Sequence, residues 1–338
     1  MNLRGPVHNN GMYPNRRTFL KTVGVASAGM MVSASVLADS GALVPKRKLG
    51  RHNEMVSSLG IGGHTLAKAK SIEEATRIAH EAIDLGATFF DNAWEYHNGR
   101  GEEWMGKVLE GKRDKVFLMT KVCTHREGQQ SKEKALAMLA ESLQRLKTDR
   151  LDLWQIHQVG SEAEADAIFK PGGVLEAIEQ ARKEGKIRYC GFTGHLNPKF
   201  HLRVLAHKYP FDAVLLPLSV FDAHADGFQK LVLPELIKQG IAPLAMKTMG
   251  GNGKPVADGA IKAEEALRYA LSLPITTLVS GIDTMEWLKH NARVAADFKP
   301  YSPEEMQALE KKCSGQDQYE PYRKWAYLDG KGLYGRLA

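Results

Sequence analysis

TFFDNAWEYHNGRGEEWMG, residues 88–106, contains a strand, a loop and a helix in close succession. Its first three residues favour a strand, Asp91 ends that strand, and Asn98 and two glycines break regular structure. The glutamates that follow suit the positive end of a helix dipole. A carboxylate at a strand end is therefore followed, five residues on, by the aromatic hydroxyl of Tyr96. The pair fits acid–base chemistry, but an aspartate that caps the loop and a tyrosine that packs on it would give the same pattern.

The same alternation of strands and helices extends in both directions, over residues 46–313, with no linker. About eight strand–helix units follow one another at intervals of about 30 residues, which indicates a parallel sheet with helical crossovers. Eight units favour an α/β fold of the closed (β/α)8, or TIM-barrel, type. The predicted barrel strands are 59–63, 88–91, 116–121, 151–157, 187–193, 211–216, 241–246 and 275–280. An N-terminal β-hairpin over 46–59 precedes the barrel, and a C-terminal extension follows it from residue 302 to Ala338.

An open, doubly wound sheet is the alternative fold, and two glycine-rich segments bear on it. Such a sheet would carry G-x-G-x-x-G after its first strand if it bound a dinucleotide, and GIGG at 60–63 lacks the last glycine. GGNGK at 250–254 is not a P-loop, because Pro255 stands where Ser or Thr would hold magnesium. The closed barrel is therefore favoured.

Charge and cysteine content bear on two further classes of protein. The net charge is +7, but residues 1–38 carry four basic residues and no acid, so the rest carries 42 basic against 39 acidic residues, or +3. No run of Lys or Arg interleaved with aromatic residues is present there, which argues against nucleic-acid binding. The three cysteines, Cys123, Cys190 and Cys313, are far apart and form no C-x-x-C pair. The sequence therefore predicts no thiolate-based zinc or iron–sulfur site, no disulfide framework and no bound metal.

The N-terminal 38 residues are similar to an export signal. NRRTFLK at 15–21 resembles the twin-arginine (Tat) signal, and the run of small residues over 22–37 is too short and too polar to form a stable membrane span. VLA at 36–38 fits a cleavage site. We therefore expect a signal peptide over 1–38, the Tat translocon as a partner, a single barrel domain over 39–338 and a periplasmic location. An ordinary basic start of a helix is the alternative.

Titratable residues stand at or near the ends of three neighbouring predicted strands: Asp91 with Tyr96, then Lys121, then His157. In a barrel of this kind the C-terminal ends of the strands form the active site. Lys121 and His157 end otherwise apolar runs, where a charged side chain is unfavourable unless it is paired. Alone, each has a structural explanation, as a snorkelling lysine or a core histidine. Together on one rim they predict a catalytic group.

With these residues in this order, the chain from about residue 46 to about residue 300 resembles the aldo-keto reductase family. The segments that carry the likeness are KLG at 48–50, VSSLGIGG at 56–63, FFDNAWEYHNGRGE at 89–102, TK at 120–121, RLKTDRLDLWQIH at 145–157 and GKIRYCGFTG at 185–194. The resemblance implies a barrel, a nicotinamide cofactor (NADP or NAD) and a catalytic tetrad of Asp91, Tyr96, Lys121 and His157. It also implies an oxidoreductase that interconverts a small aldehyde, ketone or sugar and the alcohol by hydride transfer.

The tetrad residues suit this chemistry. Reduction of a carbonyl by hydride leaves an alkoxide that needs a proton, and hydride chemistry belongs to the cofactor. Tyr96 would give that proton as the general acid, since a tyrosine of ordinary pKa, ~10, holds its proton at neutral pH. The ammonium of Lys121 would favour release of the proton, and Asp91 would keep Lys121 charged. His157 would orient the carbonyl oxygen through a hydrogen bond.

The expected cofactor positions depart from the family pattern. Thr193-Gly194 replaces a usual Ser-Asn pair, and an apolar residue near Leu215 replaces a glutamine. Met246, followed by Lys247, stands where an aromatic ring would stack on the nicotinamide, and a thioether packs on a ring less specifically. No arginine for a 2′-phosphate is evident over 281–291, so NADP and NAD stay open. The residues that the resemblance assigns to the cofactor are Thr193, Gly194, Met246, Lys247, Gly281 and Asn291.

Two other functions fit parts of the pattern. A non-catalytic barrel that binds nucleotide and regulates a partner would keep the fold, but the complete tetrad argues against it. A Rossmann-type sugar dehydrogenase would share the chemistry, but the glycine fingerprint is missing. The sequence leaves the substrate, the direction of the reaction and the oligomeric state open.

Overall fold

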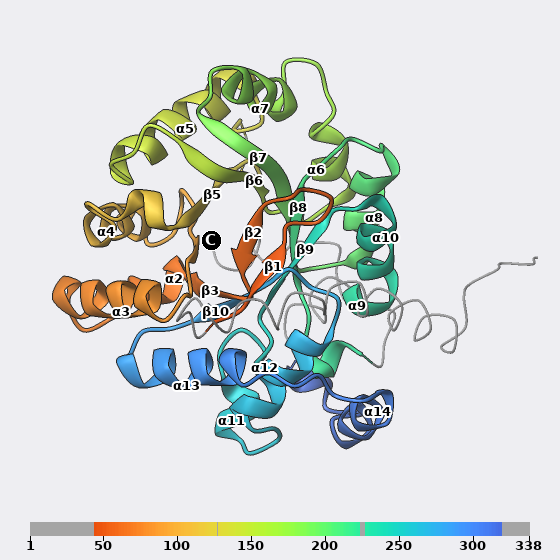
Figure 1. Ribbon diagram of the computed structural model, residues 1–338. Coiled ribbons are helices and arrows are strands. Elements are labelled where there is room, and N and C mark those ends of the chain that lie inside the picture. The colour runs from red at the N-terminus through yellow and green to blue at the C-terminus, as the bar shows by residue number, and fades with distance from the viewer. Residues whose placement is uncertain (1–43, 127, 224–226, 320–338) are drawn as a thin grey trace, which may run out of the picture.

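Eight parallel strands close into a barrel in the order β10-β3-β4-β5-β6-β7-β8-β9, with helices around the outside (Figure 1). The strands are β3 (Leu59–Gly62), β4 (Phe89–Asp91), β5 (Phe117–Cys123), β6 (Leu151–His157), β7 (Ile187–Thr193), β8 (Ala213–Pro217), β9 (Ala242–Met246) and β10 (Thr277–Gly281). This computed structural model describes residues 44–126, 128–223 and 227–319. The predicted (β/α)8 barrel is confirmed, whereas the signal peptide expected over 1–38 lies outside the described residues.

A β-hairpin of β1 (Lys46–Lys48) and β2 (Met55–Ser57) closes the end of the barrel at which the strands begin. Figure 1 shows the hairpin lying across the barrel. Leu49 and Val56 are buried in the apolar cluster that fills the barrel interior. The backbone N–H of Arg51 donates to the carbonyl oxygen of Gly240 at 2.9 Å, just before β9 begins. The hairpin predicted from the sequence is therefore present, and the polar strand ends lie at the opposite end of the barrel.

The helices of the outer layer begin where the sequence supplies caps. Ser131 accepts a hydrogen bond from the backbone N–H of Lys134, and Asn197 caps a helix that has Pro198 in its first turn. The helices are α2 (Gly63–Leu66), α3 (Ile72–Asp84), α4 (Arg100–Val108), α5 (Lys132–Arg145), α6 (Glu162–Ala167), α7 (Val174–Lys183), α8 (Pro198–Ala206), α9 (Phe228–Leu231), α10 (Leu233–Gln239), α11 (Lys254–Ala257), α12 (Ala263–Ser272), α13 (Met285–Ala296) and α14 (Pro303–Lys312). In the described part of the chain, none of the helices is long and apolar enough to cross a membrane.

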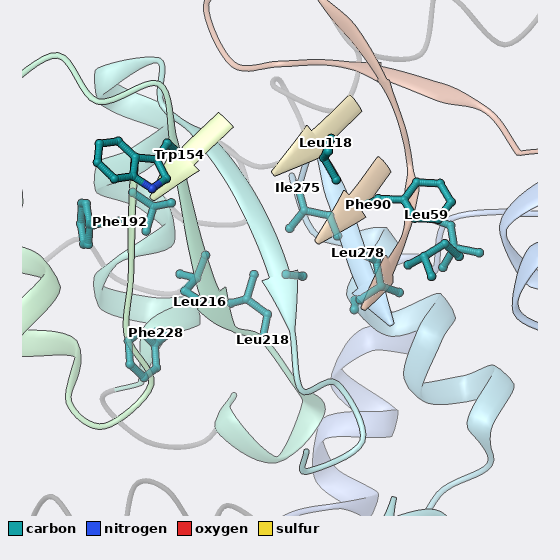
Figure 2. Close-up of a cluster of buried hydrophobic side chains, with 14 of the residues drawn as sticks. Leu59, Phe90, Leu118, Trp154, Phe192, Leu216, Leu218, Phe228, Ile275 and Leu278 are labelled. Atoms are coloured by element: carbon teal, nitrogen blue, oxygen red, sulfur yellow. The ribbon is translucent and has the colours of Figure 1, made fainter. Parts of the chain in front are cut away.

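Side chains along each strand alternate between two apolar layers. Phe90, Trp154 and Phe192 are fully buried between the sheet and the surrounding helices (Figure 2). Their neighbours Phe89 and Leu153 belong instead to the cluster inside the barrel. Apolar side chains thus fill the interior of the barrel and helices cover its outside. Polar functional groups are therefore expected at the mouth.

The same alternation carries two tetrad residues into the barrel. Along β5 the inward positions run from Met119 to Lys121, and along β6 from Leu153 to His157. β5 was expected to end at Lys121, but it continues to Cys123, because Val122 and Cys123 still pair with β6. Lys121 therefore lies one pleat inside the mouth, where a charged side chain requires a partner.

Candidate active site

The loop after β4 is shaped to bring Tyr96 over the mouth of the barrel. Three consecutive residues, His97, Asn98 and Gly99, have positive φ values of 53°, 56° and 93° and turn the chain into α4. The side chain of Asn92 donates to the carbonyl oxygen of Gly101 at 2.9 Å and ties the two ends of the loop together. The turn therefore holds the tyrosine against the residues below it.

Tyr96, Lys121 and Asp91 form a continuous polar chain. Lys121 Nζ donates to the Asp91 carboxylate and, at 2.6 Å, to the carbonyl oxygen of Asn92, and it lies 3.2 Å from the Tyr96 hydroxyl oxygen. The side chains of Lys121 and Asp91 are only 0% and 5% exposed. Burial lowers the pKa of Lys121, and the charge of Asp91 opposes that shift. The pairing thus holds a buried ammonium beside the tyrosine hydroxyl.

His157 faces the tyrosine ring from the end of β6. The two rings meet edge to face, with centroids 5.7 Å apart. Burial lowers the pKa of His157 to about 4, although Glu95 opposes that shift, so the ring is neutral at pH 7. The structure therefore brings the four residues of the predicted tetrad together: Asp91, Tyr96, Lys121 and His157.

Glu95 is the centre of a second polar cluster, which the sequence analysis missed. Its Oε2 lies 3.4 Å from Cys123 Sγ, 3.3 Å from His125 Nε2 and 3.1 Å from Arg126 Nη2. Burial would raise the pKa of Glu95, but hydrogen bonds from His125 and His157 hold it well below its ordinary value. Burial lowers the pKa of His125, but its contacts with Cys123 and Glu95 outweigh burial and raise that pKa to about 10. The signal in the sequence was position, since the carboxylate, thiol and imidazole each stand within four residues of a tetrad member.

Thr193 and Gly194 lie at the mouth end of β7, and packing explains why residue 194 is not asparagine. A Cβ on Gly194 would lie 2.6 Å from the carbonyl oxygen of Val159 and 2.7 Å from Cε1 of His201. Any side chain there would have to displace backbone. The next residue, His195, is buried, and burial lowers its pKa well below the ordinary value.

Met246 and Lys247 reach the same mouth from β9. Met246 is half-buried and packs against the interior cluster. Lys247 has a φ of 57°, a left-handed conformation that ends the strand sharply. Burial raises the pKa of Asp91, and the charges of Lys121 and Lys247 both oppose that rise. Lys247 is therefore a second cation close to the tetrad.

Gly281 and Asn291 belong to the neighbouring β10 and α13. Gly281 is the exposed last residue of β10, and a Cβ there would lie 2.8 Å from the hydroxyl oxygen of Thr65. Asn291 is buried, and its Nδ2 donates to the Ser280 hydroxyl at 3.0 Å. Gly281 thus lies at the mouth, whereas the Asn291 amide is occupied in holding α13 against β10.

Gln158, directly after β6, offers an acceptor that the sequence analysis did not single out. Its Oε1 is buried and has no hydrogen-bond partner among the residues that the structure describes. The next backbone N–H, that of Val159, donates to the carbonyl oxygen of Thr193 at 2.7 Å, so Gln158 stands beside the expected cofactor position. A buried acceptor without a partner at the mouth fits the amide of a nicotinamide. Residues around the mouth therefore suit the cofactor even though the expected asparagine is absent.

A closed (β/α)8 barrel with a Tyr–Lys–Asp–His group at its C-terminal mouth defines a barrel enzyme equipped for acid–base chemistry. The sequence model of the Aldo/keto reductase family matches residues 58–254, which include the whole tetrad. The chain therefore belongs to that family. It is accordingly an NAD(P)-dependent oxidoreductase.

Individual relatives agree with this assignment. An uncharacterized oxidoreductase of Bacillus subtilis, YqkF, is 28% identical over 82% of this chain and 99% of its own length. The holo form of the aldo-keto reductase AKR11C1 from Bacillus halodurans is 25% identical, covers 82% of this chain and 99% of its own, and has a TM-score of 0.67. An aldo/keto reductase from Klebsiella pneumoniae, solved in complex with NADP and acetate, is 22% identical over 79% of this chain and 95% of its own, with a TM-score of 0.64, and shares the fold.

Proposed function

We propose that this protein interconverts a small carbonyl compound (an aldehyde, ketone or sugar) and its alcohol, with Tyr96 exchanging the proton. The observation that carries the proposal is the 3.2 Å contact between the Tyr96 hydroxyl and Nζ of Lys121, a buried cation that is itself paired with Asp91. A structural tyrosine needs no such partner. The family assignment supports hydride transfer to or from a nicotinamide, and the geometry supports proton transfer by Tyr96.

A nicotinamide bound at the mouth supplies or accepts the hydride. In the reduction, Tyr96 gives its proton to the oxygen that becomes the alcohol. Lys121 stabilises the phenolate that is left, and Asp91 keeps Lys121 protonated. His157 lies edge-on to Tyr96 and orients the substrate oxygen. Because the proton exchange is reversible, the same residues serve reduction and oxidation.

NADP is the cofactor that we propose, with NAD as the alternative. Gln158 Oε1 would accept from the nicotinamide amide, beside Thr193 and Gly194. Met246 would pack on the ring, and Lys247 offers a cation to phosphate near Gly281. The related enzyme from Klebsiella pneumoniae that was solved with NADP supports the choice. Nucleotide affinity measured for NADP and NAD side by side would decide it.

Tyr96→Phe tests the proton donor. The variant should fold and bind nucleotide but lose roughly 10²–10⁴-fold in kcat, because only the hydroxyl is removed. The assay is oxidation of NADPH or NADH over a panel of aldehydes, ketones and sugars. Tyr301→Phe is the matched control, because Tyr301 packs under Arg268, next to α14. Near wild-type turnover in Tyr96→Phe would refute the assigned acid. No turnover by the wild type, with nucleotide still bound, would favour the non-catalytic barrel.

Export is the second part of the proposal. The NRRTFLK segment at 15–21, with the cleavage-like VLA at 36–38, supports passage through the Tat translocon in the folded state and a periplasmic location. Replacing Arg16 and Arg17 by lysine should leave the chain in the cytoplasm. Fractionation of cells that express the two forms measures this, and equal distribution of both would refute the signal.

A further inference from the structure

Next to the tetrad, three different donor groups converge on one point. The carboxylate of Glu95, the thiol of Cys123 and the imidazole of His125 bring their donor atoms within 4.8 Å of one another. They come from three places: the loop after β4, the last residue of β5, and the segment two residues beyond it. All three are enclosed, since Cys123 is fully buried and the side chains of His125 and Glu95 are 5% and 10% exposed. The cluster belongs to the barrel mouth and not to the outer surface.

The spacing of the donor atoms matches a tetrahedral ion. Glu95 Oε2 lies 3.4 Å from Cys123 Sγ and 3.3 Å from His125 Nε2, and Sγ lies 3.7 Å from Nε2. Around tetrahedral zinc, bonds to sulfur, nitrogen and oxygen place the donor atoms about 3.3–3.7 Å apart. Sγ lies 3.7 Å from His125 Nδ1 as well, so the imidazole ring must rotate to direct Nε2 at the ion, whereas the strands need not move.

Two further contacts orient the donors as a metal site requires. His125 Nδ1 lies 3.3 Å from the carbonyl oxygen of His157, which can accept its N–H, so Nε2 is the ring nitrogen that would bind the ion. His157 Nδ1 lies 2.8 Å from Glu95 Oε1, the oxygen that is not aimed at the cluster. A backbone carbonyl behind a histidine and a polar group behind a carboxylate are the usual outer partners of metal ligands.

One neighbour competes for the carboxylate. Arg126 Nη2 lies 3.1 Å from Glu95 Oε2. Its side chain is 54% exposed, so it can turn into solvent when a cation takes its place. A hydrogen-bonded cluster explains the carboxylate and the imidazole, and apolar packing accounts for the burial of Cys123. A thiol beside a carboxylate and an imidazole is nevertheless a weak hydrogen-bond partner and a strong ligand of soft metals.

We propose that Glu95, Cys123 and His125 bind one divalent transition-metal ion, of the zinc class. Carboxylate, thiolate and imidazole together suit zinc, and three protein ligands with an open position are typical of reactive sites. The proposal departs from the sequence-based expectation of no metal, because Cys123 and His125 form only a two-residue pair and the third donor, Glu95, comes from a separate loop. Any role in polarising substrate oxygen rests on the proposed function, whereas binding itself does not.

Cobalt(II) is the probe, because thiolate ligation gives it a charge-transfer band. The full-length chain is stripped with a chelator and titrated with Co²⁺, and metal content is measured before and after. We expect one ion per chain and a thiolate band that Zn²⁺ abolishes. Cys123→Ser should remove the band and weaken binding at least tenfold, while Cys313→Ser, the matched thiol control, keeps both. His157→Gln should weaken binding roughly 10–100-fold through its contact with Glu95.

Three results would overturn the proposal: no stoichiometric ion, a thiolate band that survives in Cys123→Ser, or a band that disappears in Cys313→Ser. Glu95→Gln provides a second variant if Cys123→Ser fails to fold, and unchanged affinity in it would also overturn the site. Tyr96→Phe should bind Co²⁺ normally while losing turnover. Failure of the metal site and failure of the proposed function are thereby distinguished.

Discussion

Replacing Gly194 by alanine tests whether packing, and not the cofactor, sets the residue at this rim position. The added Cβ would lie 2.6 Å from the Val159 carbonyl oxygen and 2.7 Å from Cε1 of His201, well inside contact distance. The carbonyl belongs to the backbone and His201 is fully buried, so neither can move away freely. Overpacking of this kind costs roughly 1–3 kcal/mol. For a chain of this size that corresponds to a decrease in Tm of roughly 2–5 °C.

Thermal and urea unfolding of the purified variant measure this cost. Gly160→Ala is the matched control, because its Cβ would meet the end of the Leu196 side chain at 3.2 Å, and a methyl group can rotate away. We expect the control to change stability by less than about 1 kcal/mol. An unchanged Tm in Gly194→Ala would refute the packing argument. Tighter nucleotide binding by Gly194→Asn without loss of stability would show that the glycine is a replaceable departure from the family pattern.

Three more outcomes are expected. His201 is buried with its pKa lowered from 6.5 to about 3, so the unfolded state takes up its proton first as the pH falls. Folding stability should therefore decrease by roughly 2–3 kcal/mol more between pH 6 and pH 4 in the wild type than in His201→Leu, in urea unfolding at each pH. Lys121→Met should lower the free energy of unfolding by roughly 3–5 kcal/mol, because it leaves a buried charge unpaired. Adding Asp91→Asn should restore stability but not activity. Wild-type stability in Lys121→Met alone would contradict the pairing. If the protein is exported with its cofactor, periplasmic material should keep its nucleotide through dialysis, with a Kd near nanomolar, about −12 kcal/mol; empty protein with micromolar affinity would contradict this.

The barrel and the tetrad could be predicted because each depends on local pattern. Alternating strand and helix signals predict the parallel barrel, and a titratable residue at a strand end is directed to the mouth by the geometry of the fold. Asp91 and His157 end their strands as expected. The end of β5 was expected at Lys121, because a charged residue usually ends a buried strand. The strand continues to Cys123 because Lys121 is paired with Asp91 in the interior.

The Glu95 cluster was not predicted, because Glu95 comes from a different segment from Cys123 and His125 and only its position near the tetrad pointed to it. From the sequence alone, Glu95 is an ordinary loop carboxylate, Cys123 is an ordinary core thiol, and His125 is an ordinary loop imidazole. Their proximity depends on the left-handed turn at 97–99 and on the exact pairing of β5 with β6. Gly194 carries a similar lesson, because the contact that forbids a side chain involves Val159 and His201, which are distant in sequence.

The hairpin of β1 and β2 covers the end of the barrel at which the strands begin, and apolar side chains fill the interior, so the tetrad faces solvent at the opposite end alone within the described part of the chain. With the proposed function, reactant and product would both arrive and leave at that end, near Tyr96 and Lys247. A molecule that has reacted occupies the route of the next one until it leaves. A product that leaves slowly would therefore act as an inhibitor of its own enzyme. Changes to residues of the mouth should accordingly affect release as much as capture.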